Sequence, residues 1–180
     1  MRLDAAGWID EADIIASPNF DTRPPGCRIE LAVVHAISLP PGQFGGGFVQ
    51  DLFLNRLDPA AHPYFADIVA LRVSAHFLIR RDGRLIQFVS CLRRAWHAGA
   101  SVWQGRERCN DFSLGIELEG SDHVPFEVSQ YGVLNRLLSA LREEYPLQAV
   151  VGHSDIAPGR KTDPGPFFDW GRVSSFEMPR

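Results

Sequence analysis

Residues 31–39 read LAVVHAISL, an apolar and β-branched run of strand length that is followed by two prolines and a glycine. The stretches VSAHFLIR (73–80) and RLIQFVS (84–90) alternate around an Asp-Gly pair, which is the strongest short-range signal of a β-hairpin. DFSLGIELEG (111–120) and QAVVG (148–152) are two further strand-like runs. Together these stretches predict the strands of one β-sheet.

The rest of the chain alternates between helical and irregular patterns. Apolar residues recur with helical spacing from Val49 to Leu57, which predicts a helix there. A second amphipathic helix is predicted over residues 128–145, where Pro146 ends it. Turn-forming residues are frequent in three segments that we expect to be loops, 16–30, 58–68 and 93–110. We therefore predict a mixed α/β fold, with one sheet and two or three main helices.

Composition limits the classes of protein that this chain can belong to. Its 180 residues fit one domain, and the 45% hydrophobic content is enough for a sizeable core without disulfide or metal staples. The formal net charge of −4 argues against a nucleic-acid partner. No run approaches the roughly 20 apolar residues of a membrane span. The charged N-terminal segment lacks a signal-peptide pattern, and Cys27, Cys91 and Cys109 are widely scattered, so we expect a cytoplasmic protein without a disulfide framework.

Three polar residues interrupt patterns that predict apolar or turn residues. His35 lies inside the first strand-like run, His153 follows the last one, and Asp163 precedes a proline in KTDPGP. Each of them alone is more often a hydrogen-bonded core histidine or a turn aspartate. Together, two imidazoles and a carboxylate form a ligand set of catalytic Zn²⁺ with an open fourth position. Their spacing differs from the HExxH motif, so a helix-borne zinc site is not predicted.

Further charged residues lie close to these candidates in the sequence. Pro164 favours an extended conformation for Asp163, so Lys161 and Asp163 are expected to face the same side. Glu117 and Glu119 alternate with apolar residues in the run 111–120. The pattern alone favours a solvent-facing sheet surface for both glutamates, although either could exchange a proton if that face carried a metal. The pattern does not choose between them.

Two other histidines are rivals for the metal. His76 lies in a predicted central strand and His97 follows Trp96 in the stretch AWHAG. We assign both of them mainly to hydrogen bonding and to the architecture of a pocket.

Several stretches in order along the chain resemble one known family. They are VVHAISLPPGQFGG (33–46), DPAAHPYFADI (58–68), VSAHFLIRRDG (73–83), RAWHAGAS (94–101), GRERCNDFSLGIELEG (105–120) and GHSDIAPGRKTDPGPFFDW (152–170). In these stretches the chain closely resembles the bacterial AmpD family of 1,6-anhydro-N-acetylmuramyl-L-alanine amidases. That family belongs to the wider group of type-2 amidases and peptidoglycan recognition proteins. The resemblance covers nearly all of residues 7–170, the expected core of one amidase domain spanning 1–180.

The resemblance implies a single-domain α/β fold, in which a central mixed β-sheet is flanked by helices and a zinc site lies in a groove. It implies that His35, His153 and Asp163 bind Zn²⁺, that Glu117 is the general acid and base, and that Lys161 stabilises the oxyanion. It leaves Glu119 a supporting role. Residues that would contact the sugar or the peptide stem are Trp96, Arg72 and Arg108.

The implied activity is zinc-dependent hydrolysis of the lactyl–L-alanine amide of small muropeptides, by a cytoplasmic monomer of peptidoglycan recycling that influences β-lactamase induction. Two residues depart from the family pattern. Ala36 stands where Asn is common, which puts one substrate contact in doubt, and Ser154 stands where Cys is frequent. The alternatives are a non-catalytic muropeptide-binding module and a periplasmic amidase that cuts intact peptidoglycan.

Overall fold

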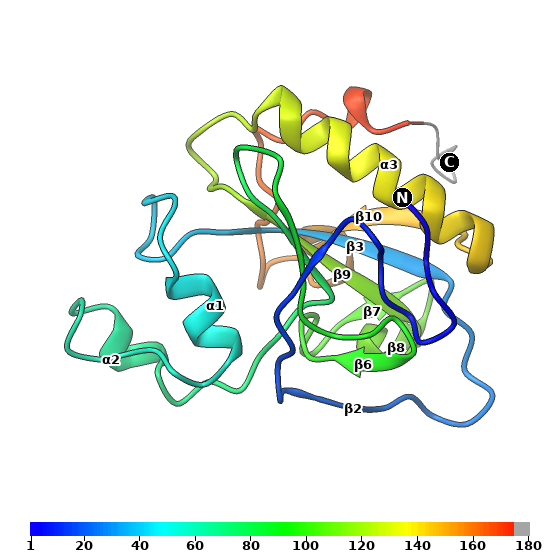
Figure 1. The fold of residues 1–180 in the computed structure, drawn as a ribbon, viewed down its shortest axis with the longest axis horizontal. Coiled ribbons are helices and arrows are strands. Elements are labelled where there is room, and N and C mark those ends of the chain that lie inside the picture. Colours follow the sequence, from blue (N-terminus) through cyan, green and yellow to red (C-terminus); the bar gives the residue numbers. More distant parts are fainter. Residues whose placement is uncertain (175–180) are drawn as a thin grey trace.

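A six-stranded mixed sheet forms the centre of the protein in the computed structural model, which describes residues 1–174 (Figure 1). Its strand order is β1-β5-β4-β9-β3-β10. The β4–β5 pair is antiparallel and the other neighbouring strands are parallel. The bounds of the strands are β1 Asp13–Ile14, β3 Leu31–Ile37, β4 Phe77–Ile79, β5 Leu85–Gln87, β9 Ser113–Glu119 and β10 Ala149–Gly152.

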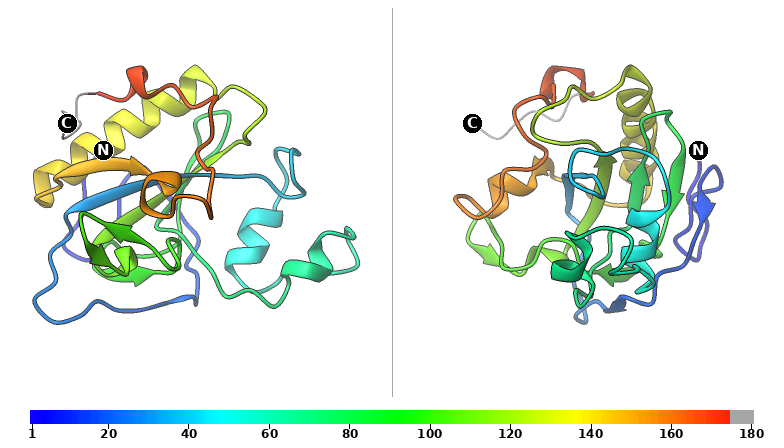
Figure 2. Two further views of the ribbon diagram at one scale, coloured as in Figure 1. Left: turned by 180° about the vertical axis from the view of Figure 1, so that it is seen from behind. Right: turned by 90° about the vertical axis from the view of Figure 1, so that its left-hand side faces the viewer.

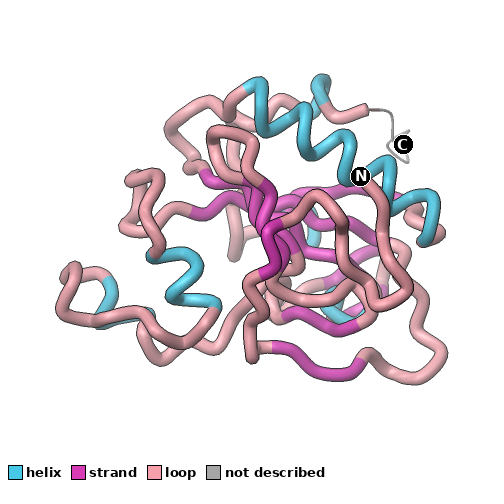
Figure 3. Tube along the Cα trace, in the orientation of Figure 1, coloured by secondary structure: helices cyan, strands magenta, loops and turns pink. Residues whose placement is uncertain are grey.

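Shorter elements complete the fold. Two small antiparallel sheets pair β2 with β6 and β7 with β8. Their strands are β2 Phe20–Thr22, β6 Arg93–Ala95, β7 Val102–Trp103 and β8 Arg106–Glu107. The helices are α1 Phe48–Phe53, α2 Phe65–Ile68, α3 Val128–Glu144 and α4 His153–Ile156, with 3-10 turns at Cys109–Asp111 and Trp170–Arg172. Irregular segments connect them, as the pink parts of Figure 3 show.

Helix α3 covers one face of the sheet (Figures 1 and 2). Its buried residues include Leu134 and Leu141, which belong to the same core cluster as Val34 and Ile116 of the central strands. Because side chains alternate along a strand, these apolar residues leave His35 and Glu117 on the opposite face. Helices α1 and α2 form an arm that projects to the left in Figure 1. The second face of the sheet and this arm together enclose the candidate site.

Most of the predicted elements are confirmed. The hairpin around Asp82-Gly83, the strand within 111–120 and the amphipathic helix at 128–145 all form. The two strands of the hairpin, β4 and β5, are shorter than predicted. Helix α3 begins with a capping box between Glu127 and Gln130. The mixed α/β architecture is therefore as predicted.

Three loop predictions were wrong in part, because each segment gains order from distant partners. Residues 20–22 of the expected N-terminal loop pair with 93–95 of another expected loop, through hydrogen bonds that local sequence does not reveal. Residues 65–68 of the third expected loop form the single-turn helix α2, whose Phe65 is fully buried. None of the helices within residues 1–174 is long and apolar enough to cross a membrane.

Candidate metal and catalytic site

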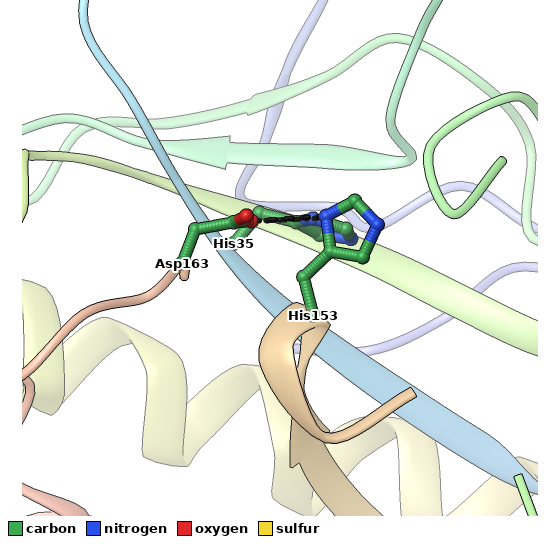
Figure 4. Close-up of side chains that lie close together, drawn as sticks. All are labelled: His35, His153 and Asp163. Atoms are coloured by element: carbon green, nitrogen blue, oxygen red, sulfur yellow. Dashed lines mark hydrogen bonds and ion pairs between the residues drawn. The ribbon is translucent and has the colours of Figure 1, made fainter. Parts of the chain in front are cut away.

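Two histidines and one aspartate converge on a single point at the edge of the second sheet face (Figure 4). The Nδ1 atoms of His35 and His153 lie 3.0 Å apart. Asp163 Oδ2 lies 3.0 Å from His35 Nδ1 and 3.1 Å from His153 Nδ1. The three residues predicted as metal ligands are therefore brought together, although 128 positions separate the first from the last.

Strand pairing and one loop contact produce this convergence. His35 lies near the end of β3, and the parallel neighbour β10 places His153 directly after its last residue, at the start of α4. Ser154 N–H donates to the Asp163 carbonyl at 2.9 Å, which holds the loop that carries Asp163 against α4. Gly152 permits this approach, since a Cβ there would lie 2.8 Å from Pro164 Cδ.

The protonation states of the three side chains suit a divalent cation. Burial lowers the pKa of His35 to about 4, so its imidazole is neutral at neutral pH. His153 Nε2 lies 3.1 Å from the Ala98 carbonyl, so it carries the proton there and leaves a lone pair on Nδ1. Two neutral imidazoles and a carboxylate are the donor set of a catalytic zinc site.

The two glutamates of β9 have different surroundings. Glu117 pairs in register with His35 and lines the same pocket. Its pKa is raised well above 4.5 by burial and then by the charge of Asp163, while Lys161 opposes the shift. The prediction of a solvent-facing surface for both glutamates was wrong, because every residue of β9 is buried. The second sheet face is covered by the site and by the segments that pack on it.

Glu119 instead binds the backbone at the end of the sheet. It accepts hydrogen bonds from Gly45 N–H at 2.6 Å and from Arg81 N–H at 3.2 Å, and it forms an ion pair with Arg80 at 3.4 Å. These contacts hold the β3–α1 loop and the hairpin together, so Glu119 has no free carboxylate oxygen directed at the metal candidates.

The three candidate ligands open into a pocket of about 370 Å³. Lys161 and Asp163 both line it, as the extended geometry before Pro164 predicts. Its polar lining includes Glu117 and Lys161. Its apolar lining comes from the end of β3 and from the arm, with Leu39, Leu52, Phe53, Tyr64, Ile68 and Leu71. Such a pocket can bind a ligand that is partly apolar and place one of its bonds near the polar groups.

His97 and His76 lie behind the candidate ligands. His97 Nδ1 is 2.9 Å from His35 Nε2, whereas His76 Nδ1 accepts the Gly115 N–H at 3.0 Å. Burial lowers the pKa of His76 to about 3 and that of His97 well below 6.5. Both histidines are hydrogen-bonded neutral residues, as expected, but only His97 also lines the pocket.

Comparison with known proteins shows which family the chain belongs to. Residues 25–166 match the family model described as N-acetylmuramoyl-L-alanine amidase. The chain is 55% identical over 181 residues to the 1,6-anhydro-N-acetylmuramyl-L-alanine amidase AmpD of Citrobacter freundii, covering 99% of this chain and 96% of the relative. The chain belongs to the N-acetylmuramoyl-L-alanine amidase family.

Solved structures agree with this assignment. The fold matches the crystal structure of a selenomethionine derivative of AmpD with a TM-score of 0.94 at 55% identity, covering 96% of this chain and 97% of that one. It also matches Escherichia coli AmiD in complex with the substrate anhydro-N-acetylmuramic acid-L-Ala-D-γ-Glu-L-Lys, with a TM-score of 0.59 at 30% identity, covering 84% and 59% of the two chains. The predicted resemblance to the AmpD family is confirmed, and the protein is an amidase.

Of the three residues predicted to contact the substrate, only Trp96 lines the pocket. Ala36, the departure from the family pattern, lines it as well. Arg72 follows Leu71, which lines the pocket, but its guanidinium donates to the carbonyls of Val69 and Leu71. Arg108 is an exposed residue that forms an ion pair with Asp111 at 3.4 Å. The structure does not bring either arginine into the pocket, and their contact with a peptide stem stays a prediction.

Other features of this amidase site were missed from the sequence. Thr162 Oγ1 donates to Asp122 Oδ2 at 2.6 Å, which fastens the loop between Lys161 and Asp163 to the segment after β9. Nothing in the local pattern around Asp122 signals this contact. The close approach of His97 to β9 did leave a signal, because a glycine, Gly115, lies inside this strand.

Proposed function

We propose that this amidase hydrolyses the amide between the lactyl group of 1,6-anhydro-N-acetylmuramic acid and L-alanine in muropeptides, and that it requires Zn²⁺. The name of the Citrobacter freundii relative and the substrate bound to Escherichia coli AmiD support this substrate. The observation that carries the proposal is the convergence of His35, His153 and Asp163 at the floor of a pocket that Glu117 and Lys161 also line.

The donor set fits the metal. With Nε2–H of His153 bound to the Ala98 carbonyl, the Nδ1 lone pair of this histidine points at His35 Nδ1 and at the Asp163 carboxylate. Acceptor atoms that converge in this way repel one another unless a proton or a metal cation lies between them. Zn²⁺, when bound by His35, His153 and Asp163, would supply Lewis-acid chemistry that polarises the scissile carbonyl and acidifies the attacking water.

Glu117 moves the proton in this reaction. As a carboxylate it accepts a proton from the attacking water, and as a carboxylic acid it donates that proton to the departing nitrogen of alanine. Burial supports both roles, because the raised pKa of Glu117 brings its two forms closer in free energy at neutral pH. The C–N bond breaks, and the products are a lactyl carboxylate and a free α-amino group.

Lys161 stabilises the negative charge that develops on the carbonyl oxygen. Its residue lines the pocket, close enough to Glu117 and His35 for its charge to affect both. An ammonium group that is already in place when charge develops lowers the barrier without reorganisation. The apolar part of the lining can hold the sugar and lactyl portion, and Trp96 offers a flat surface to the sugar ring.

The finer biological role is also part of the proposal. We propose that the protein acts as a monomer on soluble muropeptides in the cytoplasm, in peptidoglycan recycling with an influence on β-lactamase induction. Cell fractionation with a tagged chain tests the compartment, and sedimentation tests the oligomeric state. Recovery of the protein in the periplasm, or cleavage of intact sacculi at rates equal to those for soluble anhydro-muropeptide, would favour the wall-cutting alternative.

Product analysis tests the reaction itself. The purified protein is incubated with an anhydro-muropeptide that carries a tripeptide stem, and the products are identified by mass spectrometry. We expect 1,6-anhydro-N-acetylmuramic acid and the free tripeptide, and no other cleavage. An intact substrate, or a cut within the stem, would refute the proposed reaction.

A further inference from the structure

One half-buried histidine outside the three candidate ligands contacts the first of them directly. His97 Nδ1 lies 2.9 Å from His35 Nε2, on the side of the His35 ring that faces away from Asp163. The other ring nitrogen of His97, Nε2, lies 3.2 Å from the hydroxyl of the fully buried Ser113. His35, His97 and Ser113 therefore form a hydrogen-bonded chain that leads from the site into the core.

The direction of this chain decides what His35 can bind. A neutral imidazole carries one proton, so His35 can offer a lone pair at Nδ1 only if its proton is on Nε2. In that tautomer His35 donates Nε2–H to His97 Nδ1. In the opposite arrangement His97 donates to His35, the proton of His35 is on Nδ1, and that atom cannot be a ligand. His35 Nδ1 can therefore bind a metal only when His97 Nδ1 accepts the hydrogen bond from His35 Nε2–H.

The surroundings of His97 accommodate the first arrangement, because a serine hydroxyl can accept a hydrogen bond as well as donate one. With its proton on Nε2, His97 donates to Ser113 Oγ and leaves Nδ1 as an acceptor. The ring cannot rotate freely, because it packs on the backbone of β9. A Cβ at Gly115 would lie only 2.4 Å from His97 Cγ, which shows how closely the ring approaches the strand.

The backbone of the same segment is fixed as well. Asn110 Oδ1 accepts the N–H groups of His97 and Ala98, at 3.1 and 2.8 Å. The Ala98 carbonyl in turn lies 3.1 Å from His153 Nε2. The dipeptide His97-Ala98 therefore contacts the Nε2 atoms of both candidate ligand histidines. The His97 side chain contacts His35 Nε2, and the Ala98 carbonyl contacts His153 Nε2.

From this geometry we propose that His97 is a positioning residue for the metal site: its Nδ1 accepts the Nε2–H of His35 and holds His35 in the tautomer that presents Nδ1 to the metal. This role rests on the proposed zinc function. His97 does not itself bind the metal or the substrate in this account. A hydrogen-bond partner behind a ligating histidine contributes to metal affinity, and its loss costs about 10–100-fold.

Asparagine and leucine at position 97 form a matched pair that separates this role from simple packing. They have nearly the same branched shape, but only His97→Asn places an acceptor, Oδ1, at the position of the lost Nδ1. We expect His97→Leu to weaken Zn²⁺ binding about 10–100-fold, measured by equilibrium competition with a chromophoric chelator. His97→Asn should retain an affinity close to that of the wild type.

His76→Leu is the control for loss of a buried histidine on the same sheet face, because His76 is fully buried and its hydrogen-bond partners are Gly115, Arg93 and Arg23 instead of His35. It should leave the affinity for Zn²⁺ unchanged. Equal losses in His97→Leu and His97→Asn, or a loss in His76→Leu as large as that in His97→Leu, would overturn the proposal, because packing alone would then explain the effect.

A second readout needs no metal. Because the Asp163 carboxylate lies 3.0 Å from His35 Nδ1 and would draw the proton to that atom when no metal is present, the measurement uses an Asp163→Ala background. Long-range ¹H–¹⁵N correlation spectra of this metal-free background report which nitrogen of His35 carries the proton. We expect the Nε2–H form in Asp163→Ala alone and with His97→Asn added, and a mixture of the two forms with His97→Leu added. If His97→Leu does not fold, Ser113→Ala replaces it, since loss of the Ser113 acceptor frees His97 to reverse its direction and should give the same mixture. An unchanged His35 tautomer in both variants would contradict the proposal.

The two measurements also distinguish failure of this inference from failure of the proposed function. A wild-type protein that binds no Zn²⁺ would refute the zinc proposal, whereas the His35 tautomer would still test the hydrogen bond to His97. A wild type that binds Zn²⁺ with no sensitivity to His97→Leu would refute the positioning role alone.

Discussion

Replacing Glu117 and Glu119 in turn by glutamine should affect activity and stability in opposite ways. Glu117 lines the pocket next to His35, whereas Glu119 accepts two backbone N–H groups and pairs with Arg80. Glutamine has nearly the same shape as glutamate but neither accepts nor donates the catalytic proton. Glu117→Gln should therefore lose at least about 100-fold in kcat, which equals about 2.7 kcal/mol in the barrier.

The free energy of unfolding of the metal-free protein should fall in Glu119→Gln and not in Glu117→Gln. Burial raises the pKa of Glu117 above its ordinary value of 4.5, so folding favours the protonated form and the ionised form costs free energy. The contribution of Glu117 to stability is therefore lost as the pH rises above about 4.5, and Glu117→Gln should be at least as stable as the wild type at pH 8. Glu119→Gln should lose about 1.5–3 kcal/mol for weakened bonds to a charged group and keep most of its activity.

The assay combines steady-state kinetics on an anhydro-muropeptide with urea unfolding of both variants and the wild type, each with zinc removed for the unfolding series. The circular dichroism spectrum checks that the variants fold. An essential Glu119 together with a dispensable Glu117 would refute the assignment of the two residues. Loss of stability in Glu117→Gln would refute the claim that the pocket strains its ionised form.

Three further predictions test other parts of the account. Lys161→Met should keep the zinc and lower kcat with little change in KM, since its charge meets a group that exists only in the transition state; a rise in KM alone would mean that Lys161 binds ground-state substrate. Arg72→Ala and Arg108→Ala should each raise KM for a tripeptide substrate, at a cost of about 1.5–3 kcal/mol, and much less for a substrate trimmed to L-alanine; equal penalties on both would mean that the arginines only support their loops. Because burial lowers the pKa of His76 to about 3 from its ordinary 6.5, the unfolded chain takes up a proton that the folded one refuses, so the free energy of unfolding should fall as the pH drops from 6.5 towards 3, by up to about 1.4 kcal/mol per pH unit; His76→Gln should flatten this slope, and an unchanged slope would contradict the assignment.

Local patterns were sufficient for the parts of the fold that depend on near neighbours. The Asp82-Gly83 pair predicts its hairpin because the turn type follows from those two residues. Helix α3 follows from its apolar spacing and from Pro146. His35 is conspicuous because it interrupts a strand that is otherwise apolar, and its alternation places it on the face opposite α3.

The remaining features depend on contacts between distant segments. Pairing of residues 20–22 with 93–95 requires that two irregular segments meet, and neither has a strand pattern of its own. The meeting of His153 with Asp163 depends on the Ser154 hydrogen bond and on the close approach of Pro164 to Gly152. Spacing therefore left these ligands as weak candidates, and the family resemblance supplied what local sequence could not.

The two glutamates of β9 show the same limit. Alternation correctly places Glu117 and Glu119 on one face, but it does not reveal that the face is covered. The partner that distinguishes them is the β3–α1 loop, whose Gly45 reaches Glu119 and not Glu117. That loop is 74 positions away in the sequence, so the division of roles becomes visible only in the folded chain.

A zinc titration of the metal-free enzyme tests the central claim most directly. The purified protein is stripped of metal by a chelator, zinc is returned in steps, and the initial rate of cleavage of an anhydro-muropeptide is measured at each step. Because His35, His153 and Asp163 form a single site, the rate should start near zero, rise linearly and reach a plateau at one zinc per chain. Full activity before any zinc is added would contradict the claim that these three residues hold a metal on which the reaction depends.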